Sequence, residues 1–444
     1  MKVDFTCKRG LLKLKFFPKI NERSDYTGNI KMEREACFIR MPEDWTVDSI
    51  HPDLFAMAIV LIVYPFIYDE IDIGIGVSKS FHDEFLRITG KKILPVNKTL
   101  KPRKSKKNAR PALAFSGGVD STVALTLLPE ETCCVFVDRV VPKDMTNQTL
   151  YNKEFVYNAC NYLSRLGKGV YTIETDFEYI RSPRGFVIEY STSVPAILLA
   201  DYNNGFDSIS SGTVLESAYL EFKDFNATRL YHIDWRNLFN VIDLPRNDVT
   251  AGLSNVATLK ILYKDQRYID FVKSCMSGDR VSTCFNCWKC FRKTLILKAL
   301  FGDEIQDTLI DELFLITEAR TYLRRLPIRF ENQFVYITAK YQGNHPLMVL
   351  LKRLTKGDRL EYEWMEKWYS PSREHISKKY CNVIESNIRK YVETMSKKEE
   401  VIDQRWESRE DYRTKTYQEQ HQKFIDAMIT HRNVFKNHLL MQKK

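Results

Sequence analysis

The sequence predicts an α/β protein built on a doubly wound parallel sheet. Between residues 111 and 300, short apolar runs typical of strands alternate with segments of helical spacing, which is the pattern of βαβ units. The run at 132–137 is continuously apolar, as expected for a parallel strand buried on both faces. A Gly-Gly turn follows the first strand, and ligands of doubly wound sheets bind beyond the carboxyl ends of the strands.

The elements follow one another in a regular order. In the central region, strands are expected at 112–115, 132–137, 169–173 and 206–210, and helices at 122–128, 150–166 and 194–199. Residues 1–97 indicate an N-terminal α+β module, with strands at 12–17, 36–41 and 71–77 and a buried helix at 54–67. Residues 301–444 indicate a helical C-terminal region, in which Phe424, Ile425, Met428 and Ile429 are expected on one packed stripe.

Residues 98–110 form the boundary between the first two regions. They carry a run of lysines and arginines and have little to bury, which predicts a solvated basic linker. An arm that binds nucleic acid is the alternative.

The composition narrows the class of protein. The 444 residues are 44% apolar and 12% aromatic, which suffices for packed cores and excludes a disordered chain. The net charge of +10 permits an anionic partner, but it also fits an ordinary basic protein. The longest apolar stretch, 54–67, contains Pro65 and is too short to cross a bilayer, so no membrane partner is expected. Ten cysteines without a secretory signal indicate a reducing compartment, and a cytoplasmic protein is expected.

The clearest functional signal is Ser-Gly-Gly-Val-Asp-Ser at 116–121, here called the glycine loop. It joins an expected strand to an expected helix, where unpaired N–H groups and the helix dipole favour an anion. The glycines permit close approach of a phosphate, Ser116 and Ser121 offer hydroxyl donors, and Asp120 suits a magnesium ion. The pattern is neither a Walker A motif nor G-x-G-x-x-G, and an ordinary Gly-Gly turn is the alternative.

The second signal is a group of four cysteines spaced C-x8-C-x2-C-x2-C, namely Cys275, Cys284, Cys287 and Cys290. Four thiolates so close in sequence match a closed tetrahedral site, which predicts a structural Zn²⁺. Arg280 and Lys289 are candidates to offset the negative charge of the thiolates. A redox pair would use only two of the four thiols, and four unrelated buried thiols are the remaining alternative.

The glycine loop resembles the pyrophosphate loop of the PP-loop ATP pyrophosphatases and matches its S-G-G-x-D-S pattern at every position. Together with the four cysteines that follow, residues 111–300 resemble the 7-cyano-7-deazaguanine synthases. The resemblance implies a nucleotide α-hydrolase-like fold with a zinc-bearing lobe, and the cofactors ATP, Mg²⁺ and Zn²⁺. That family adenylates the carboxylate of 7-carboxy-7-deazaguanine with release of pyrophosphate, then uses ammonia to form an amide and finally a nitrile.

The resemblance also implies roles for individual residues. The residues implied to bind ATP are Ser116, Gly117, Gly118, Val119, Asp120 and Ser121, with Asp120 and Ser121 as catalytic residues. Asp138, at the expected end of the second strand, is a candidate for ribose or metal contact, or a plain strand-end residue. Lys260 is a candidate phosphate contact, or a surface lysine. The implied partner is a small-molecule carboxylate, and a homodimer is left open.

Three stretches depart from the family where it would recognise the deazapurine. They are 136–140, 210–217 and the neighbourhood of 182–185, where the family's Pro-Gly-Arg-Asn segment is not evident. The ATP chemistry therefore carries over more directly than the substrate. One alternative is an enzyme of a bacterial antiviral defence system that passes the activated group to a protein or nucleic acid. Further alternatives are a PP-loop enzyme that modifies tRNA bases and a scaffold that binds ATP without turnover.

Overall fold

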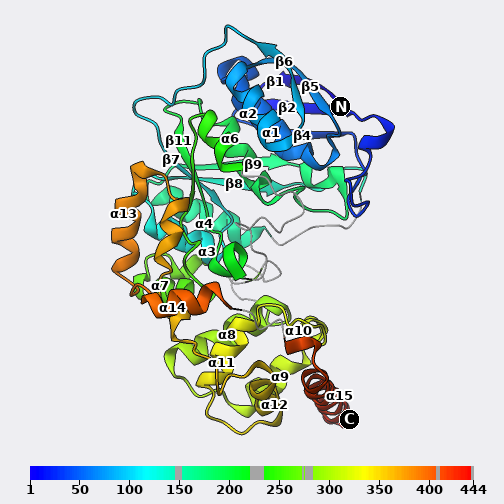
Figure 1. Cartoon of the computed structure of the whole chain (residues 1–444), viewed down its shortest axis with the longest axis vertical. Helices are drawn as coiled ribbons and strands as arrows, with labels where there is room; N and C mark the ends of the chain where they lie inside the picture. Colours follow the sequence, from blue (N-terminus) through cyan, green and yellow to red (C-terminus); the bar gives the residue numbers. More distant parts are fainter. Residues whose placement is uncertain (146–152, 221–234, 273–274, 276–283, 407–410, 442–444) are drawn as a thin grey trace.

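The computed structural model describes residues 1–145, 153–220, 235–272, 275, 284–406 and 411–441 (Figure 1). Its centre is a ten-stranded sheet in the order β12-β11-β7-β8-β9-β4-β2-β1-β5-β6. The pairings are parallel except for β9 with β4, β4 with β2 and β2 with β1. The predicted mixed α/β architecture with a largely parallel sheet is therefore confirmed.

Five parallel strands form the part of the sheet that carries the glycine loop. They are β7 (Arg110–Phe115), β8 (Cys133–Arg139), β9 (Val170–Thr175), β11 (Phe206–Ser211) and β12 (Arg246–Asp248). β8 and β9 lie on one side of β7, whereas β11 and β12 lie on the other. The strand order thus reverses between β7 and β11, and such a switch point is where open α/β sheets bind ligands.

Helices cover both faces of the sheet because successive strand residues point to opposite sides. Leu113 of β7 belongs to an apolar core with α3 (Val119–Leu127), α4 (Glu154–Arg165) and α7 (Asn255–Asp265). Its neighbour Ala112 belongs to a second core, together with α1 (Pro52–Val63), α5 (Val194–Leu198) and α6 (Trp235–Val241).

The N-terminal region extends the same sheet through β1 (Lys2–Lys8), β2 (Leu11–Phe17), β4 (Ala36–Arg40), β5 (Glu70–Ser78) and β6 (Lys92–Asn97). β4 pairs antiparallel with β9, so that Ile39 lies opposite Thr175. Helix α1 is buried along its whole length, from Asp53 to Val63, while α2 (Lys79–Thr89) is amphipathic. The N-terminal and central regions therefore share one core.

The basic segment 98–110 contains neither helix nor strand before β7, but several of its residues bind the folded core, and Arg103 is the most deeply buried of them. Arg103 is 2% exposed, and its Nε lies 2.9 Å from Asp201 Oδ1. The rest of the guanidinium donates to the backbone carbonyls of Ala200, Phe206, Ile242 and Asp243. The expectation of a fully solvated linker is wrong at this residue, because the planar guanidinium finds acceptors for its donors inside the protein.

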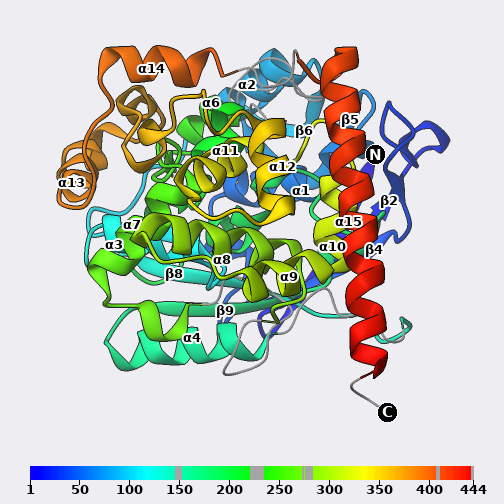
Figure 2. The same cartoon turned by 90° about the horizontal axis from the view of Figure 1, so that it is seen from below.

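The C-terminal region is helical, as predicted. Helix α8 (Trp288–Phe301) leads into it, and the region itself comprises α9 (Asp307–Leu315), α10 (Thr317–Leu323), α11 (Glu331–Lys340), α12 (Pro346–Thr355), α13 (Lys378–Arg389), α14 (Lys397–Gln404) and α15 (Lys415–Met441). These helices share the core of α3 and α7, and Figure 2 shows α15 running along one edge of the helical layer. Phe424 and Met428 are buried as predicted, whereas Ile429 of the same expected stripe is 41% exposed.

Among the described helices, none has both the length and the apolar composition needed to cross a membrane.

Candidate functional site

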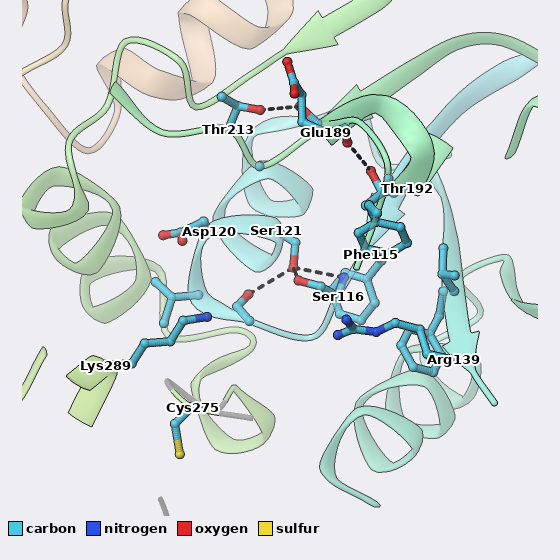
Figure 3. Close-up of a pocket in the computed structure, with 18 of the residues that line it drawn as sticks. Phe115, Ser116, Asp120, Ser121, Arg139, Glu189, Thr192, Thr213, Cys275 and Lys289 are labelled. Carbon is cyan, nitrogen blue, oxygen red and sulfur yellow. Dashed lines mark hydrogen bonds between the residues drawn. The ribbon is translucent and has the colours of Figure 1, made fainter. Parts of the chain in front are cut away.

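The glycine loop lies at the carboxyl end of β7 and leads directly into α3 (Figure 3). Gly117 has a φ of +71°, in the left-handed region that favours glycine, and a Cβ there would lie 3.2 Å from Val156 Cγ1. Gly118 is the N-cap residue of α3 and has no side chain with which to cap the helix. The first amides of α3 therefore stay available for an anion.

Two serine hydroxyls hold the loop together. Ser121 Oγ lies 3.0 Å from Ser116 Oγ and donates to the carbonyl of Gly118 at 3.1 Å. It also accepts the backbone N–H of Ser116 at 3.3 Å. Ser121 is buried and Ser116 is exposed, so Ser121 fixes the shape of the loop while Ser116 faces the solvent side.

The loop packs against the neighbouring strand through Gly212, the first residue after β11. A Cβ on Gly212 would lie 2.7 Å from the backbone nitrogen of Ser121 and 2.8 Å from the carbonyl carbon of Asp120. Both distances are far below van der Waals contact, so this close approach of β11 to α3 requires glycine. Sequence reasoning did not find Gly212, because the requirement comes from a strand that is remote in sequence.

A cavity of about 300 Å³ opens beside the loop. Its lining includes two acidic side chains, Asp120 and Glu189, and four basic ones, Arg139, Arg246, Lys289 and Lys293. Aromatic rings line another part of the wall, namely Phe115, Phe136, Phe155 and Phe186. Basic side chains outnumber acidic ones in the lining, which suits a polyanion, and the aromatic wall suits a planar ring.

The two arginines of the lining are fixed by protein partners. The guanidinium of Arg246 forms an ion pair with Asp248 and lies 4.3 Å from the ring centre of Tyr190. Arg139 Nη1 lies 3.0 Å from Glu178 Oε1, which holds this arginine at the end of β8. Both guanidiniums are therefore held in place by ion pairs that offset their charge, which leaves Lys289 and Lys293 as the basic side chains of the lining without such a pair among the described residues.

The structure brings Asp120 to the cavity, but Asp138 is not among the residues that line it. Asp120 Oδ1 accepts a hydrogen bond from Thr258 Oγ1 of α7 at 3.2 Å. Asp138 is buried at the carboxyl end of β8, where Lys153 and Tyr157 engage its carboxylate. Both partners of Asp138 lie on the α4 side of the sheet, which accounts for its position.

Lys260, the other candidate phosphate contact, lies in an ion-pair network instead of the cavity lining. Its Nζ is 2.8 Å from Glu366, which also accepts from Lys340 Nζ and from the Tyr336 hydroxyl at 2.8 Å each. Burial alone would raise the pKa of Glu366, but these three hydrogen bonds lower it to about 2. The network ties α7 to α11.

Glu366→Gln is expected to lower the stability of the protein at pH 7 by about 2 kcal/mol, since solvent screening reduces what the pKa shift alone would give. Because the folded pKa lies below the ordinary value of 4.5, the wild-type advantage is present above pH 4.5 and is lost as pH falls towards 2. The difference in melting temperature between the wild type and Glu366→Gln, measured from pH 7 to about pH 3, tests this pH dependence. A difference that does not shrink with acid would contradict the network as its cause.

The four predicted metal ligands converge. The sulfur atoms of Cys275, Cys284, Cys287 and Cys290 all lie within 4.8 Å of one another. Those of Cys284 and Cys290 are 3.7 Å apart, close to the edge of about 3.8 Å in a tetrahedron of zinc–sulfur bonds. Cys287 caps α8, since its Sγ accepts the backbone N–H of Cys290 at 3.4 Å. The cluster could therefore hold a structural zinc ion; Arg280 lies outside the described residues, and Lys289 lines the cavity.

A second group of potential ligands joins three helices of the C-terminal region. Asp311 Oδ1 lies 2.9 Å from His345 Nε2 and 2.8 Å from His431 Nε2. His345 Nδ1 accepts the backbone N–H of Leu347 at 3.3 Å, so the proton of the neutral ring lies on Nε2. In this tautomer His345 donates to Asp311, and the group is a hydrogen-bonded clamp between α9, α12 and α15.

A model of a family of unknown function, DUF6395, matches residues 234–407. The matched segment contains β12, the four cysteines and the helices from α6 to α14, but not the glycine loop. No curated protein matches the chain, and no solved structure does.

Proposed function

We propose that this protein cleaves ATP between the α- and β-phosphates and transfers AMP to a carboxylate. The observation that carries the proposal is the position of the glycine loop. It lies at the switch point between β7 and β11 and borders a cavity with an excess of basic side chains. The strand order β12-β11-β7-β8-β9 is consistent with the nucleotide α-hydrolase-like fold that the resemblance implies.

In this proposal the glycine loop holds the pyrophosphate half of ATP. The uncapped amides at the start of α3 bind the phosphate oxygens, and Gly117 and Gly118 permit their close approach. The Asp120 carboxylate is the hard oxygen ligand that Mg²⁺ prefers, and it lines the same cavity. Mg²⁺ bound together with ATP would neutralise part of the negative charge on the phosphates.

The reaction is an in-line displacement at the α-phosphorus. A carboxylate oxygen of the substrate forms the new bond to phosphorus, the bond to the bridging oxygen breaks, and its electron pair leaves with pyrophosphate. Positioning and charge stabilisation supply most of the rate, so the protein needs no activated nucleophile of its own.

We propose 7-carboxy-7-deazaguanine as the carboxylate. The resemblance over residues 111–300 supports it, and the aromatic wall of the cavity could stack a planar heterocycle. In the same proposal, a zinc ion on the four cysteines is structural, because four protein ligands leave no position for water or substrate.

The test is to incubate the full-length protein with ATP, Mg²⁺ and 7-carboxy-7-deazaguanine and to identify the products by chromatography and mass spectrometry. The proposal predicts pyrophosphate together with the acyl-adenylate of the deazaguanine. When an ammonium salt is added, ammonia displaces AMP, so that free AMP and the amide appear in amounts equal to the pyrophosphate. ADP as the nucleotide product would overturn the reaction class. AMP that forms only when protein or tRNA is added would overturn the small-molecule acceptor but not the cleavage of ATP.

Gly212→Ala is expected to lower the rate of AMP formation by about 10- to 100-fold. The added Cβ would displace the backbone at Asp120 and Ser121, and misplacement of a phosphate-binding loop by a fraction of an ångström suffices for such a loss. Initial rates at saturating ATP measure the effect.

Gly167→Ala is the matched control. Gly167 has a φ of +78° and nothing within 4 Å of an added Cβ, so alanine there costs about 1 kcal/mol of backbone strain without touching the loop. The control should keep the wild-type rate. Equal rates for Gly212→Ala and Gly167→Ala would show that the contact between β11 and α3 has no part in the reaction.

A further inference from the structure

Lys293 is a buried cation in the wall of the cavity. Its side chain is 5% exposed and lines the cavity beside the glycine loop. Within the described part of the chain, Lys293 has no hydrogen bond or ion pair, whereas Arg246 and Arg139 of the same wall are each paired with a carboxylate. Burial of an ammonium without a partner is costly, so an anionic ligand is the partner that its position calls for.

The charges around Lys293 point to the same conclusion. The groups that act on it are Asp120, Glu216, Lys289 and Arg292. Glu216 is already saturated by hydrogen bonds from backbone and amide groups of α7 and α11. Burial lowers the pKa of Lys293, and Asp120 is the strongest of the groups that oppose this. Lys293 and Asp120 line the same cavity, in which Asp120 and the glycine loop would hold phosphate.

Helix α8 brings Lys293 to this position. Lys289 and Lys293 are four residues apart, so they lie on one face of α8, and both line the cavity. Figure 3 shows Lys289 reaching towards the loop near Asp120. The helix begins at the cysteine cluster, since Cys287 is its N-cap and Cys290 precedes Lys293 by about one turn. A metal ion bound by the cluster would therefore also fix the positions of Lys289 and Lys293.

We infer that Lys293 is a catalytic residue that contacts the ATP phosphates bound at the glycine loop. The inference rests on the proposed function. As the bond between the α-phosphorus and the bridging oxygen breaks, its electron pair passes to pyrophosphate. The ammonium of Lys293 balances this added charge through a charge-assisted hydrogen bond and gives up no proton.

The experiment compares Lys293→Met and Lys293→Arg with the wild type, in the full-length protein with ATP, Mg²⁺ and 7-carboxy-7-deazaguanine. Lys293→Met is expected to lower kcat by about 100-fold or more, with a much smaller change in KM for ATP. Lys293→Arg should recover part of the rate. The melting temperature of Lys293→Met should equal or exceed that of the wild type, because an apolar chain of similar length replaces a buried unpaired charge.

Lys298→Met is the matched control on the same helix. Lys298 lies outside the cavity lining and pairs with Asp303 at 3.1 Å, so its replacement should leave kcat unchanged. If the wild type forms AMP and Lys293→Met does so at the same rate, the inference is overturned while the proposed function stands. A melting temperature well below the wild type would make Lys293 a structural residue and also overturn it. If the wild type neither binds ATP nor forms AMP, both the function and the inference fall.

Discussion

Replacement of Cys287 by serine is expected to remove zinc from the protein and to cost on the order of 5 kcal/mol of stability. Without a cation, the hydrogen bond with Cys275 raises the pKa of Cys287 and so favours its protonated thiol. A zinc ion replaces these protons and holds the four sulfur atoms together. The loss reaches the core, because Trp288, the next residue, stacks on Phe291 at 5.6 Å and on Tyr322 at 5.2 Å.

Elemental analysis and thermal melting of the full-length protein measure this loss. The wild type should hold about one zinc ion per chain, and a strong chelator should lower its melting temperature towards that of Cys287→Ser. Cys7→Ser is the control, since Cys7 lies on β1, outside the cluster. A wild-type protein without zinc would contradict the metal site, as would a Cys287→Ser protein that melts with the wild type.

The central strands could be predicted because they are buried on both faces, which leaves continuous apolar runs in the sequence. β8 is the clearest case, since its residues from Cys133 to Asp138 are buried. β12 could not be found in this way: its three residues, Arg-Asn-Asp, are polar, although they are buried. Their burial depends on partners such as Ser211 and Tyr190, which come from other segments of the chain.

The joining of the N-terminal and central regions could not be predicted either. It depends on the pairing of Ile39 and Arg40 with Thr175 and Glu174, a long-range contact that no local pattern encodes. The same is true of Arg103, which looks like one more charge in a basic run. Its burial follows from backbone carbonyls that the fold assembles around it.

The candidate site likewise contains some residues that the sequence predicts and others that only the fold brings together. The glycine loop and the four cysteines are contiguous or closely spaced, so residue types and spacing suffice to predict them. Gly212 and Lys293 come from separate elements, and their roles arise only from what the fold places next to them. Asp138 is the opposite case. Its position at the end of a strand indicates a ligand contact, but in the structure side chains around α4 engage its carboxylate.

Replacement of Asp120 by alanine is expected to lower AMP formation by about 1,000-fold or more. Asp120 provides a carboxylate in the cavity beside the glycine loop, and its Oδ1 is oriented by the Thr258 hydroxyl. Without this carboxylate, Mg²⁺ loses its proposed protein ligand at the phosphates. The fold should persist, because loss of an acidic residue from the first turn of α3 costs only about 0.5 kcal/mol.

Asp120 could bind Mg²⁺ through its charge, or it could only position the start of α3. Initial rates of AMP formation over a range of Mg²⁺ concentrations distinguish these two roles. Asp120→Asn keeps the size of the side chain and an acceptor for Thr258 but loses the charge, so it should be nearly as inactive as Asp120→Ala. Asp358→Ala, on an exposed turn after α12, is the control and should keep the wild-type rate. If Asp120→Asn retains the wild-type rate and Mg²⁺ dependence, the carboxylate charge is not needed. Asp120 would then serve only to position the start of α3 against α7.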